Sequence, residues 1–389
     1  MSRYIAKSIE SMPSSGIREF FDVANMMKDA ISLGVGEPDF ETPWHVREAA
    51  ISSLEKGITS YSSNSGMMEL REAIRDYLEE RFHISYDPKS QILVTVGASE
   101  GIDLALRMLI NPGDEILVVE PSYVSYKPCI SMCGGVAKEI VTKEEDQFRL
   151  TAEELERAIT PKTKALILPY PNNPTGGIME LDDLSAIAKV IIEHDIIVIS
   201  DEIYSELTYG GQHVSIAELP GMYERTIVLN GFSKAFAMTG WRLGYAAGPE
   251  EFIFHMTKIH QYIAMCAPTP SQFAGIEALR GETRDEEIDI MREAYDERRR
   301  VIVNGFRQMG LSCFEPRGAF YAFPNIQSTG MSSKDFCREL LYDQKVAVVP
   351  GTAFGQCGEG FIRCSYAYSI ENIEEALERI GTFVEKHRQ

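Results

Sequence analysis

Short apolar runs alternate with longer stretches of helical spacing from about residue 92 onward. Six runs predict β-strands, at 92–97, 115–120, 164–169, 196–200, 226–230 and 242–248. Between them, apolar residues recur every three or four positions, as in the stretches that begin at Ala98 and Leu181, which predicts amphipathic helices. Apolar strands that alternate with helices are typical of a mostly parallel sheet with helices on both faces. We therefore expect an α/β fold.

The pattern changes after about residue 285, where a long charged helix precedes shorter elements. A helix is predicted around 332–342, a strand at 346–351, and a further helix closes the chain. The N-terminal residues supply no strand to the large sheet, so we expect them to pack with this C-terminal part. The predicted division is a large domain over 48–284 and a smaller α+β domain formed by 1–47 and 285–389.

Composition narrows the classes of function. The chain has 389 residues, 44% of them hydrophobic, and a formal net charge of −20 that is spread along its length. Such a surface repels phosphate backbones and anionic lipids, and no apolar run approaches the roughly 20 residues of a membrane-spanning helix. The seven cysteines include no CxxC pair, so we expect no metal site. We expect a cytoplasmic protein without nucleic-acid or membrane partners.

Polar residues follow several of the predicted strands. Asp201 ends one apolar run, Asn173 follows another, and a glycine-containing turn at 97–102 opens a helix that could hold an anion. In open parallel sheets the ligand crevice lies beyond the carboxyl ends of the strands, so these positions converge. Each also has a plain structural explanation, since Asp201 could cap a helix and Asn173 precedes Pro174 in ordinary turn chemistry.

Lys234 lies in an unusual turn. The strand at 226–230 ends in the sequence NGFSKAFAMTGWRLGY, which carries Lys234 and then Arg242 at the head of the next predicted strand. Most lysines are solvated surface residues. Here, however, small and aromatic residues surround the lysine and few other charges accompany it, which makes Lys234 a candidate for chemistry.

The segment GFSKAFAMTGWRLG, at 231–244, resembles the cofactor-lysine signature of the class I/II aminotransferases, the pyridoxal 5′-phosphate (PLP) fold-type I family. Further motifs of that family follow in its order along nearly the whole chain: GVGEPDF, YSSNSGMMELREAI, GASEGI, EPSY, NNPTG, SDEIY, GAFYAF and FIRCSYA. The resemblance implies a large domain with a mostly parallel seven-stranded sheet, a smaller α+β domain, and PLP as cofactor. The motif sequences most closely resemble those of the aspartate-aminotransferase branch and are similar to those of bacterial N-acetyl-LL-diaminopimelate and aromatic aminotransferases.

The resemblance also implies roles in catalysis. Lys234 matches the lysine that holds the cofactor as an imine and then moves a proton between the substrate Cα and the cofactor C4′. Asp201 matches the carboxylate that faces the pyridine nitrogen. Tyr204 and Asn173 match the pair that bonds the phenolic oxygen, and Tyr123 matches the aromatic residue stacked on the ring.

The phosphate group has its own expected partners. By the resemblance, these are the backbone N–H groups of Ala98 and Ser99, the hydroxyl of Ser233 and the guanidinium of Arg242. Tyr61 matches a tyrosine that reaches the phosphate of the neighbouring subunit, which implies a homodimer with shared active sites.

One position departs from some family members, which carry serine where this chain has Gly231. On the substrate side, Arg363 matches the arginine that clamps the α-carboxylate through two parallel hydrogen bonds. Gly36 matches a glycine whose backbone approaches the substrate. Asn173 is also expected to bind the substrate.

The motifs do not identify the side chain of the substrate. We expect an amino group to pass from an L-amino acid to a 2-oxo acid, with 2-oxoglutarate as the expected acceptor, and aspartate, an aromatic amino acid or N-acetyl-LL-diaminopimelate as candidate donors. Segments 14–21 and 62–68 are expected to line the side-chain pocket. Two alternatives stay open: a PLP-dependent β C–S lyase on the same scaffold, and a PLP-binding regulator without activity.

Overall fold

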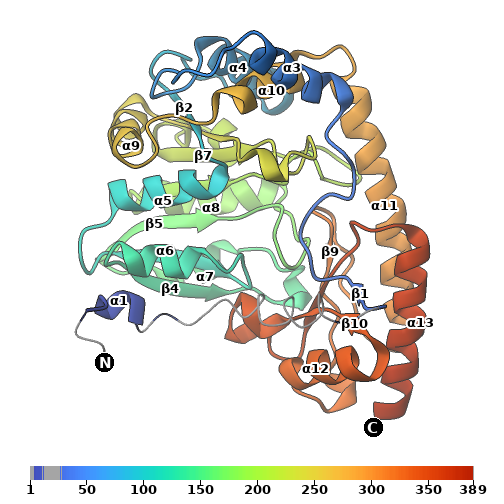
Figure 1. Cartoon of the computed structure of the whole chain (residues 1–389). Helices are drawn as coiled ribbons and strands as arrows, with labels where there is room; N and C mark the ends of the chain where they lie inside the picture. The colour runs from blue at the N-terminus through green and yellow to red at the C-terminus, as the bar shows by residue number, and fades with distance from the viewer. Residues whose placement is uncertain (1–3, 11, 13–26, 28, 389) are drawn as a thin grey trace.

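A computed structural model of the chain describes residues 4–10, 12, 27 and 29–388. Its main feature is a seven-stranded sheet with the order β2-β8-β7-β6-β5-β3-β4, drawn as arrows in Figure 1. The strands are β2 (Ile92–Thr95), β3 (Glu115–Glu120), β4 (Val136–Val141), β5 (Thr163–Leu168), β6 (Ile197–Asp201), β7 (Thr226–Gly231) and β8 (Gly244–Ala247). Strand β8 runs antiparallel to β7 and β2, while the other neighbours pair in parallel. The predicted α/β fold with a mostly parallel seven-stranded sheet is confirmed.

Alternate residues of each strand pack into different layers, because successive side chains point to opposite faces of a sheet. Ile116 and Val118 of β3 join one core with α5 (Ala98–Leu109), α6 (Tyr126–Met132) and α9 (Glu250–Ile263). Leu117 and Val119 join another with α7 (Ala152–Ala158) and α8 (Leu181–Glu193). Helices therefore cover both faces, which explains why these strands are apolar throughout.

A third group of helices covers the end of the sheet near β2 and β8, at the top of Figure 1. It consists of α3 (Trp44–Glu55), α4 (Met68–Phe82) and α10 (Thr269–Arg280). A short helix, α1 (Lys7–Glu10), lies near the N-terminus. None of the helices in the described part of the chain has the length and apolar content needed to span a lipid bilayer.

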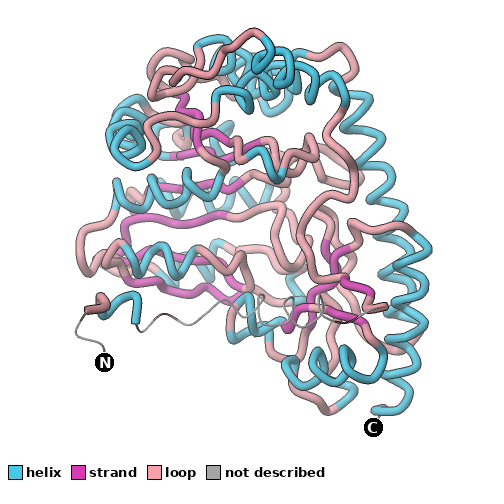
Figure 2. Tube along the Cα trace, viewed as in Figure 1, coloured by secondary structure: helices cyan, strands magenta, loops and turns pink. Residues whose placement is uncertain are grey.

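The C-terminal part forms a second unit around its own core. Two long helices, α11 (Arg284–Gln308) and α13 (Ile370–His387), pack side by side, and α12 (Ser333–Gln344) packs beside the lower part of α13 in Figure 1. Figure 2 shows its short strands in magenta beside these helices. They are β9 (Tyr321–Ala322), β10 (Val346–Ala347), β11 (Val349–Pro350) and β12 (Ile362–Ser365). Strand β1 (Ile31–Ser32) pairs in parallel with β10, so residues from both ends of the chain meet here.

The pairing of β1 with β10 brings residues near both chain ends together, and the small domain built from both ends stays a prediction. The division at 47/48 and 284/285 remains a prediction, and its first boundary falls within α3, which packs against α10. The sequence stretch 346–351 was expected to form one strand, but it forms β10 and β11, which belong to different sheets. Strand β4 was not predicted, because this edge strand is largely exposed and has no apolar run.

Candidate active site

A cavity of about 510 Å³ lies where the carboxyl ends of the sheet strands meet the second unit. Every predicted site residue except Tyr61 lines it: Gly36, Ala98, Ser99, Tyr123, Asn173, Asp201, Tyr204, Ser233, Lys234, Arg242 and Arg363. Six of them lie at the carboxyl ends of β3, β5, β6 and β7 or shortly after, and these strands pair in parallel, which is why residues far apart in the sequence converge. Tyr61 is 78% exposed and lies outside this cavity.

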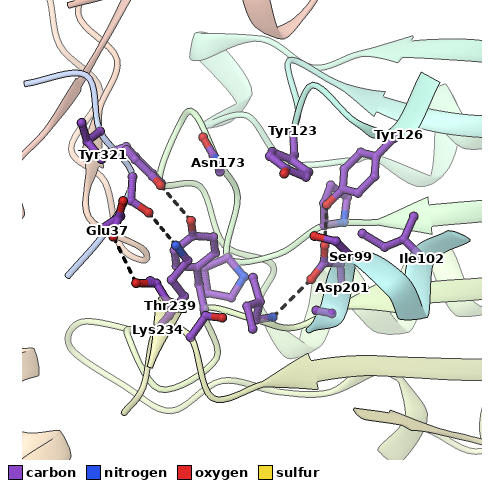
Figure 3. A pocket seen from close by; sticks show the side chains of 18 of the residues that line it. Glu37, Ser99, Ile102, Tyr123, Tyr126, Asn173, Asp201, Lys234, Thr239 and Tyr321 are labelled. Carbon is purple, nitrogen blue, oxygen red and sulfur yellow. Dashed lines mark hydrogen bonds between the residues drawn. The ribbon is translucent and has the colours of Figure 1, made fainter. Parts of the chain in front are cut away.

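Lys234 follows β7 by three residues and points into the cavity (Figure 3). Its Nζ donates a hydrogen bond of 2.6 Å to the carbonyl oxygen of Gly36 and lies 5.6 Å from the ring centre of Tyr204. Burial, with the nearby cations Arg363 and Arg242, lowers the pKa of Lys234 to about 8, although Glu37 acts in the opposite direction. Near neutral pH, the neutral and nucleophilic form of this amine is therefore far more populated than in an ordinary lysine.

This pKa predicts how cofactor-free protein reacts with an aldehyde. With a pKa of about 8, about one Lys234 amine in ten is neutral at pH 7, against about one in 3,000 for an ordinary lysine. The initial rate of PLP capture, followed by absorbance, should rise with pH and level off with a midpoint near 8. Glu37→Gln should move the midpoint to lower pH, because it removes a charge that favours the ammonium. A midpoint near 10.5 in the unaltered protein would contradict the assignment.

Asp201 is the last residue of β6 and is only 7% exposed. Tyr126 donates a hydrogen bond of 2.7 Å to its Oδ2, and the backbone N–H of Ile203 lies 3.3 Å from Oδ1 (Figure 3). Burial raises the pKa of Asp201, while these two hydrogen bonds lower it. A buried carboxylate of this kind is suited to face a cationic ring nitrogen.

The other end of the cavity favours an anion. The first turn of α5, with Ala98 and Ser99, presents backbone N–H groups, and Arg242 lies against Gly97. A Cβ on Gly97 would lie 2.6 Å from Nη2 of Arg242 and would displace the guanidinium, and the φ of 75° at this position also favours glycine. Arg242 has a φ of 50°, an uncommon conformation for a side chain of this size, and β8 begins two residues after it, at Gly244. The prediction that Arg242 heads the strand is therefore wrong.

Arg363 comes from β12 and is 3% exposed. Its guanidinium lies over two rings, with Cζ 4.5 Å from the ring centre of Tyr321 and 4.7 Å from that of Phe354. One Nη donates to Asn173 at 3.0 Å and the other to the carbonyl of Gly34, while Nε is buried without a hydrogen-bond partner. Among the described residues its hydrogen bonds go to an amide and a backbone carbonyl and none goes to a carboxylate, so this buried cation is suited to bind a carboxylate ligand.

Gly36 lines the cavity, but its missing side chain also serves a contact within the protein. A Cβ at this position would lie 2.4 Å from the hydroxyl oxygen of Tyr321. The sequence resemblance suggested only that a side chain here would intrude on the substrate. The structure adds that glycine is needed to accommodate Tyr321.

Several residues of the cavity were missed by the sequence analysis. Tyr126 is the first residue of α6, and its contact with Asp201 spans 75 residues, so no local pattern indicates it. Tyr321 lies within the GAFYAF motif, which was noted without a role for any residue. Glu37 accepts a hydrogen bond of 3.1 Å from Thr239, a contact across 202 residues that no local pattern predicts. Segment 14–21 lies outside the described residues.

The cavity fits pyridoxal phosphate by its chemistry. It combines a lysine amine of lowered pKa, a buried carboxylate that suits a pyridinium, and an anion-binding turn beside Arg242. A separate buried arginine, Arg363, has an unpartnered Nε. Among the residues that the structure describes, no group of three or more His, Cys, Asp or Glu side chains is placed to hold a metal ion.

Comparisons with known proteins agree with this chemistry. The family model for aminotransferase class I and II matches residues 28–380. YugH of Bacillus subtilis, whose name assigns it to the aminotransferases without a substrate, is 51% identical over 99% of this chain and 100% of its own. The aspartate aminotransferase of Pyrococcus abyssi is 48% identical over 94% of each chain. The solved structure of an aromatic aminotransferase from Pyrococcus horikoshii has a TM-score of 0.91 and 45% identity, covering 95% of this chain and 99% of that one.

These matches extend over both structural units and include the segments that line the cavity. The suggestion of a regulator without activity is not supported, because full-length relatives carry the names of enzymes. The β C–S lyase alternative is not favoured, since these relatives are named as aminotransferases. The chain belongs to the class I and II aminotransferase family and is a PLP-dependent transaminase.

Proposed function

We propose that this transaminase moves the amino group of an L-amino acid to 2-oxoglutarate, with Lys234 as the residue that holds the cofactor. When bound, PLP withdraws electrons from the Cα of the amino acid joined to it. Lys234, once released by the incoming amino group, would be the base that removes the proton from Cα and delivers it to the cofactor C4′. Its burial and lowered pKa support this role.

The remaining predicted residues are assigned to binding. Asp201 would keep the ring nitrogen protonated, and Tyr204 with Asn173 would hold the phenolic oxygen. Tyr123 would stack on the ring. Ala98, Ser99, Ser233 and Arg242 would hold the phosphate, and Arg363, with Asn173 and the backbone of Gly36, would hold the substrate α-carboxylate. The observation that carries the proposal is their convergence: a reactive amine, Asp201 and Arg363 line one cavity although they come from different strands.

Tyr126 is expected to support Asp201, and Tyr126→Phe tests that. The substitution removes the donor 2.7 Å from Oδ2, so the pKa of Asp201 should rise further and its charged form should become less available to a pyridinium. A buried hydrogen bond to a charged group is worth about 1.5–3 kcal/mol, so the dissociation constant for PLP should increase about 10-fold or more. Fluorescence titration of cofactor-free protein measures it.

Tyr170→Phe is a matched control for Tyr126→Phe. Tyr170 is also buried and donates to a backbone carbonyl at 2.7 Å, but it does not line the cavity. Equal weakening of PLP binding in both variants would mean that the effect is general loss of stability and not support of Asp201.

The identity of the amino donor is the next question for experiment. Relatives of similar identity are named as aspartate and as aromatic aminotransferases, so overall similarity does not select between these substrates. The experiment is a panel of Asp, Tyr, Phe, Ala and N-acetyl-LL-diaminopimelate with 2-oxoglutarate, compared by kcat/KM. Glutamate formation from at least one donor is expected. Failure of every donor with 2-oxoglutarate, but turnover with another 2-oxo acid, would overturn the proposed acceptor.

The panel should also include cystathionine to test elimination. A transaminase protonates the cofactor carbon after Cα deprotonation, whereas a lyase expels a β-substituent. We expect no pyruvate or thiol from cystathionine. Pyruvate at a rate comparable to that of glutamate formation would favour the lyase.

A homodimer is proposed from the family resemblance. In such a dimer, Tyr61, which is 78% exposed here, would reach the phosphate in the partner's cavity. Sedimentation equilibrium should give twice the chain mass, and Tyr61→Phe should weaken PLP binding without changing that mass. A cytoplasmic location likewise remains an expectation.

A further inference from the structure

Tyr321 lines the cavity, but the proposed function assigns no role to it. It lies in β9, which pairs antiparallel with β12, the strand that carries Arg363. The side chain is 1% exposed and lines the cavity beside Lys234 and Tyr204. Its strand belongs to the second unit, whereas Tyr204 follows β6 of the large sheet, so Tyr321 joins the two parts of the site.

The hydroxyl of Tyr321 makes a specific contact. Its oxygen lies 2.8 Å from the hydroxyl oxygen of Tyr204, and either group can donate (Figure 3). Gly36 makes room for this hydroxyl, since a Cβ there would lie 2.4 Å from it. Tyr204 and Gly36, which are distant in sequence, thus both accommodate the hydroxyl oxygen of Tyr321. An aromatic residue that only fills the core would need neither contact.

The ring of Tyr321 makes a second contact, with the Arg363 guanidinium. Cζ of Arg363 lies 4.5 Å from the ring centre of Tyr321 and 4.7 Å from that of Phe354. A cation that lies over two aromatic rings is attracted by the ring quadrupoles, which restrains the position of its hydrogen-bond donors. The direction in which Arg363 can bind a carboxylate therefore depends on Tyr321.

We propose that Tyr321 is a positioning residue that orients both the Tyr204 hydroxyl and the Arg363 guanidinium. The inference rests on the proposed roles of those two residues. A phenol has a single proton to donate. When Tyr204 donates its proton to the cofactor oxygen, Tyr321 donates to Tyr204 and strengthens that bond by polarisation. Its ring at the same time keeps the guanidinium fork facing the substrate α-carboxylate.

The two contacts can be separated by substitution. Tyr321→Phe removes the hydroxyl and keeps a ring against Arg363, whereas Tyr321→Leu removes both. Tyr366→Phe is the matched control, because Tyr366 is fully buried and its hydroxyl donates to a backbone carbonyl at 3.2 Å, but it does not line the cavity. All three variants are loaded with PLP and compared with the unaltered protein.

Two measurements that do not depend on turnover report on the two contacts. The first is the pH midpoint of the bound-cofactor absorbance. A weaker bond from Tyr204 to the phenolic oxygen should raise that midpoint, by about half a unit or more, in both Tyr321 variants. The second is the dissociation constant of two unreactive carboxylates, maleate and 3-phenylpropionate, by calorimetry. It should change less than about twofold in Tyr321→Phe and increase about fivefold or more in Tyr321→Leu.

The outcomes distinguish this inference from the proposed function. If the unaltered protein shows no titrating cofactor absorbance and binds neither carboxylate, the proposed function fails and the role of Tyr321 fails with it. If the unaltered protein shows both, but Tyr321→Phe keeps its pH midpoint or Tyr321→Leu keeps its carboxylate affinity, Tyr321 is only a core residue. A lowered melting temperature without these shifts, as in Tyr366→Phe, would lead to the same conclusion.

Discussion

Replacing Lys234 with alanine is expected to abolish transamination while leaving the fold and the phosphate-binding end of the cavity intact. The side chain contributes one hydrogen bond, to the carbonyl of Gly36, so its removal disturbs little of the protein. It removes both the covalent attachment of PLP and the base that moves the Cα proton. General acid–base catalysis alone contributes up to about 10⁴-fold, so kcat with the best donor should fall by about that factor or more.

Lys189→Ala is a suitable control, because Lys189 is exposed on α8, outside the cavity. It should keep full activity. Lys234→Ala should still bind PLP without covalent attachment through Arg242 and the first turn of α5. Residual turnover within about tenfold of the unaltered protein would remove Lys234 from the chemical step.

Arg363→Lys is expected to weaken every amino donor and every 2-oxo acid by a similar factor. Lysine keeps the positive charge but replaces the planar fork by a single ammonium group, and it loses the contacts of the guanidinium with the rings of Tyr321 and Phe354. The loss of one charge-assisted hydrogen bond corresponds to about 10- to 100-fold in kcat/KM. Because all substrates share the α-carboxylate, donors with different side chains should be affected alike.

Arg299→Lys controls for the effect on stability. Arg299 is also buried in the second unit and bonds to Asp296 and Glu315, but it does not line the cavity. This variant should lower the melting temperature without a matching loss of kcat/KM. An effect of Arg363→Lys on one donor alone would place Arg363 in side-chain recognition and not in α-carboxylate binding.

The sequence was informative where burial leaves a strong pattern. The strands β3, β5, β6 and β7 are apolar on both faces because helices cover both, and the pattern located each of them within one residue at either end. The edge strand β4 has one buried residue and left no such pattern. The antiparallel direction of β8 is also invisible in sequence, since alternation of side chains is the same in either direction.

The residues of the candidate site also fall into those that the sequence could place and those that it could not. Residues that follow the strands directly, such as Asp201 and Lys234, could be placed because the carboxyl ends of parallel strands converge. Tyr126, Tyr321 and Glu37 were missed as functional residues because their importance depends on tertiary contacts with residues far along the chain. The family motifs supplied roles, but only the structure shows that Gly36 and Tyr321 are adapted to each other.

The most direct test of the account is to locate the residue that carries the cofactor. Protein loaded with PLP is treated with borohydride, which fixes the cofactor to its lysine, and the digested protein is mapped by mass spectrometry. We expect the modification on Lys234, at close to one cofactor per chain, and we expect prior addition of an amino donor to prevent it. Modification of another lysine, or of Lys234 no more than of exposed lysines, would show that Lys234 does not hold the cofactor.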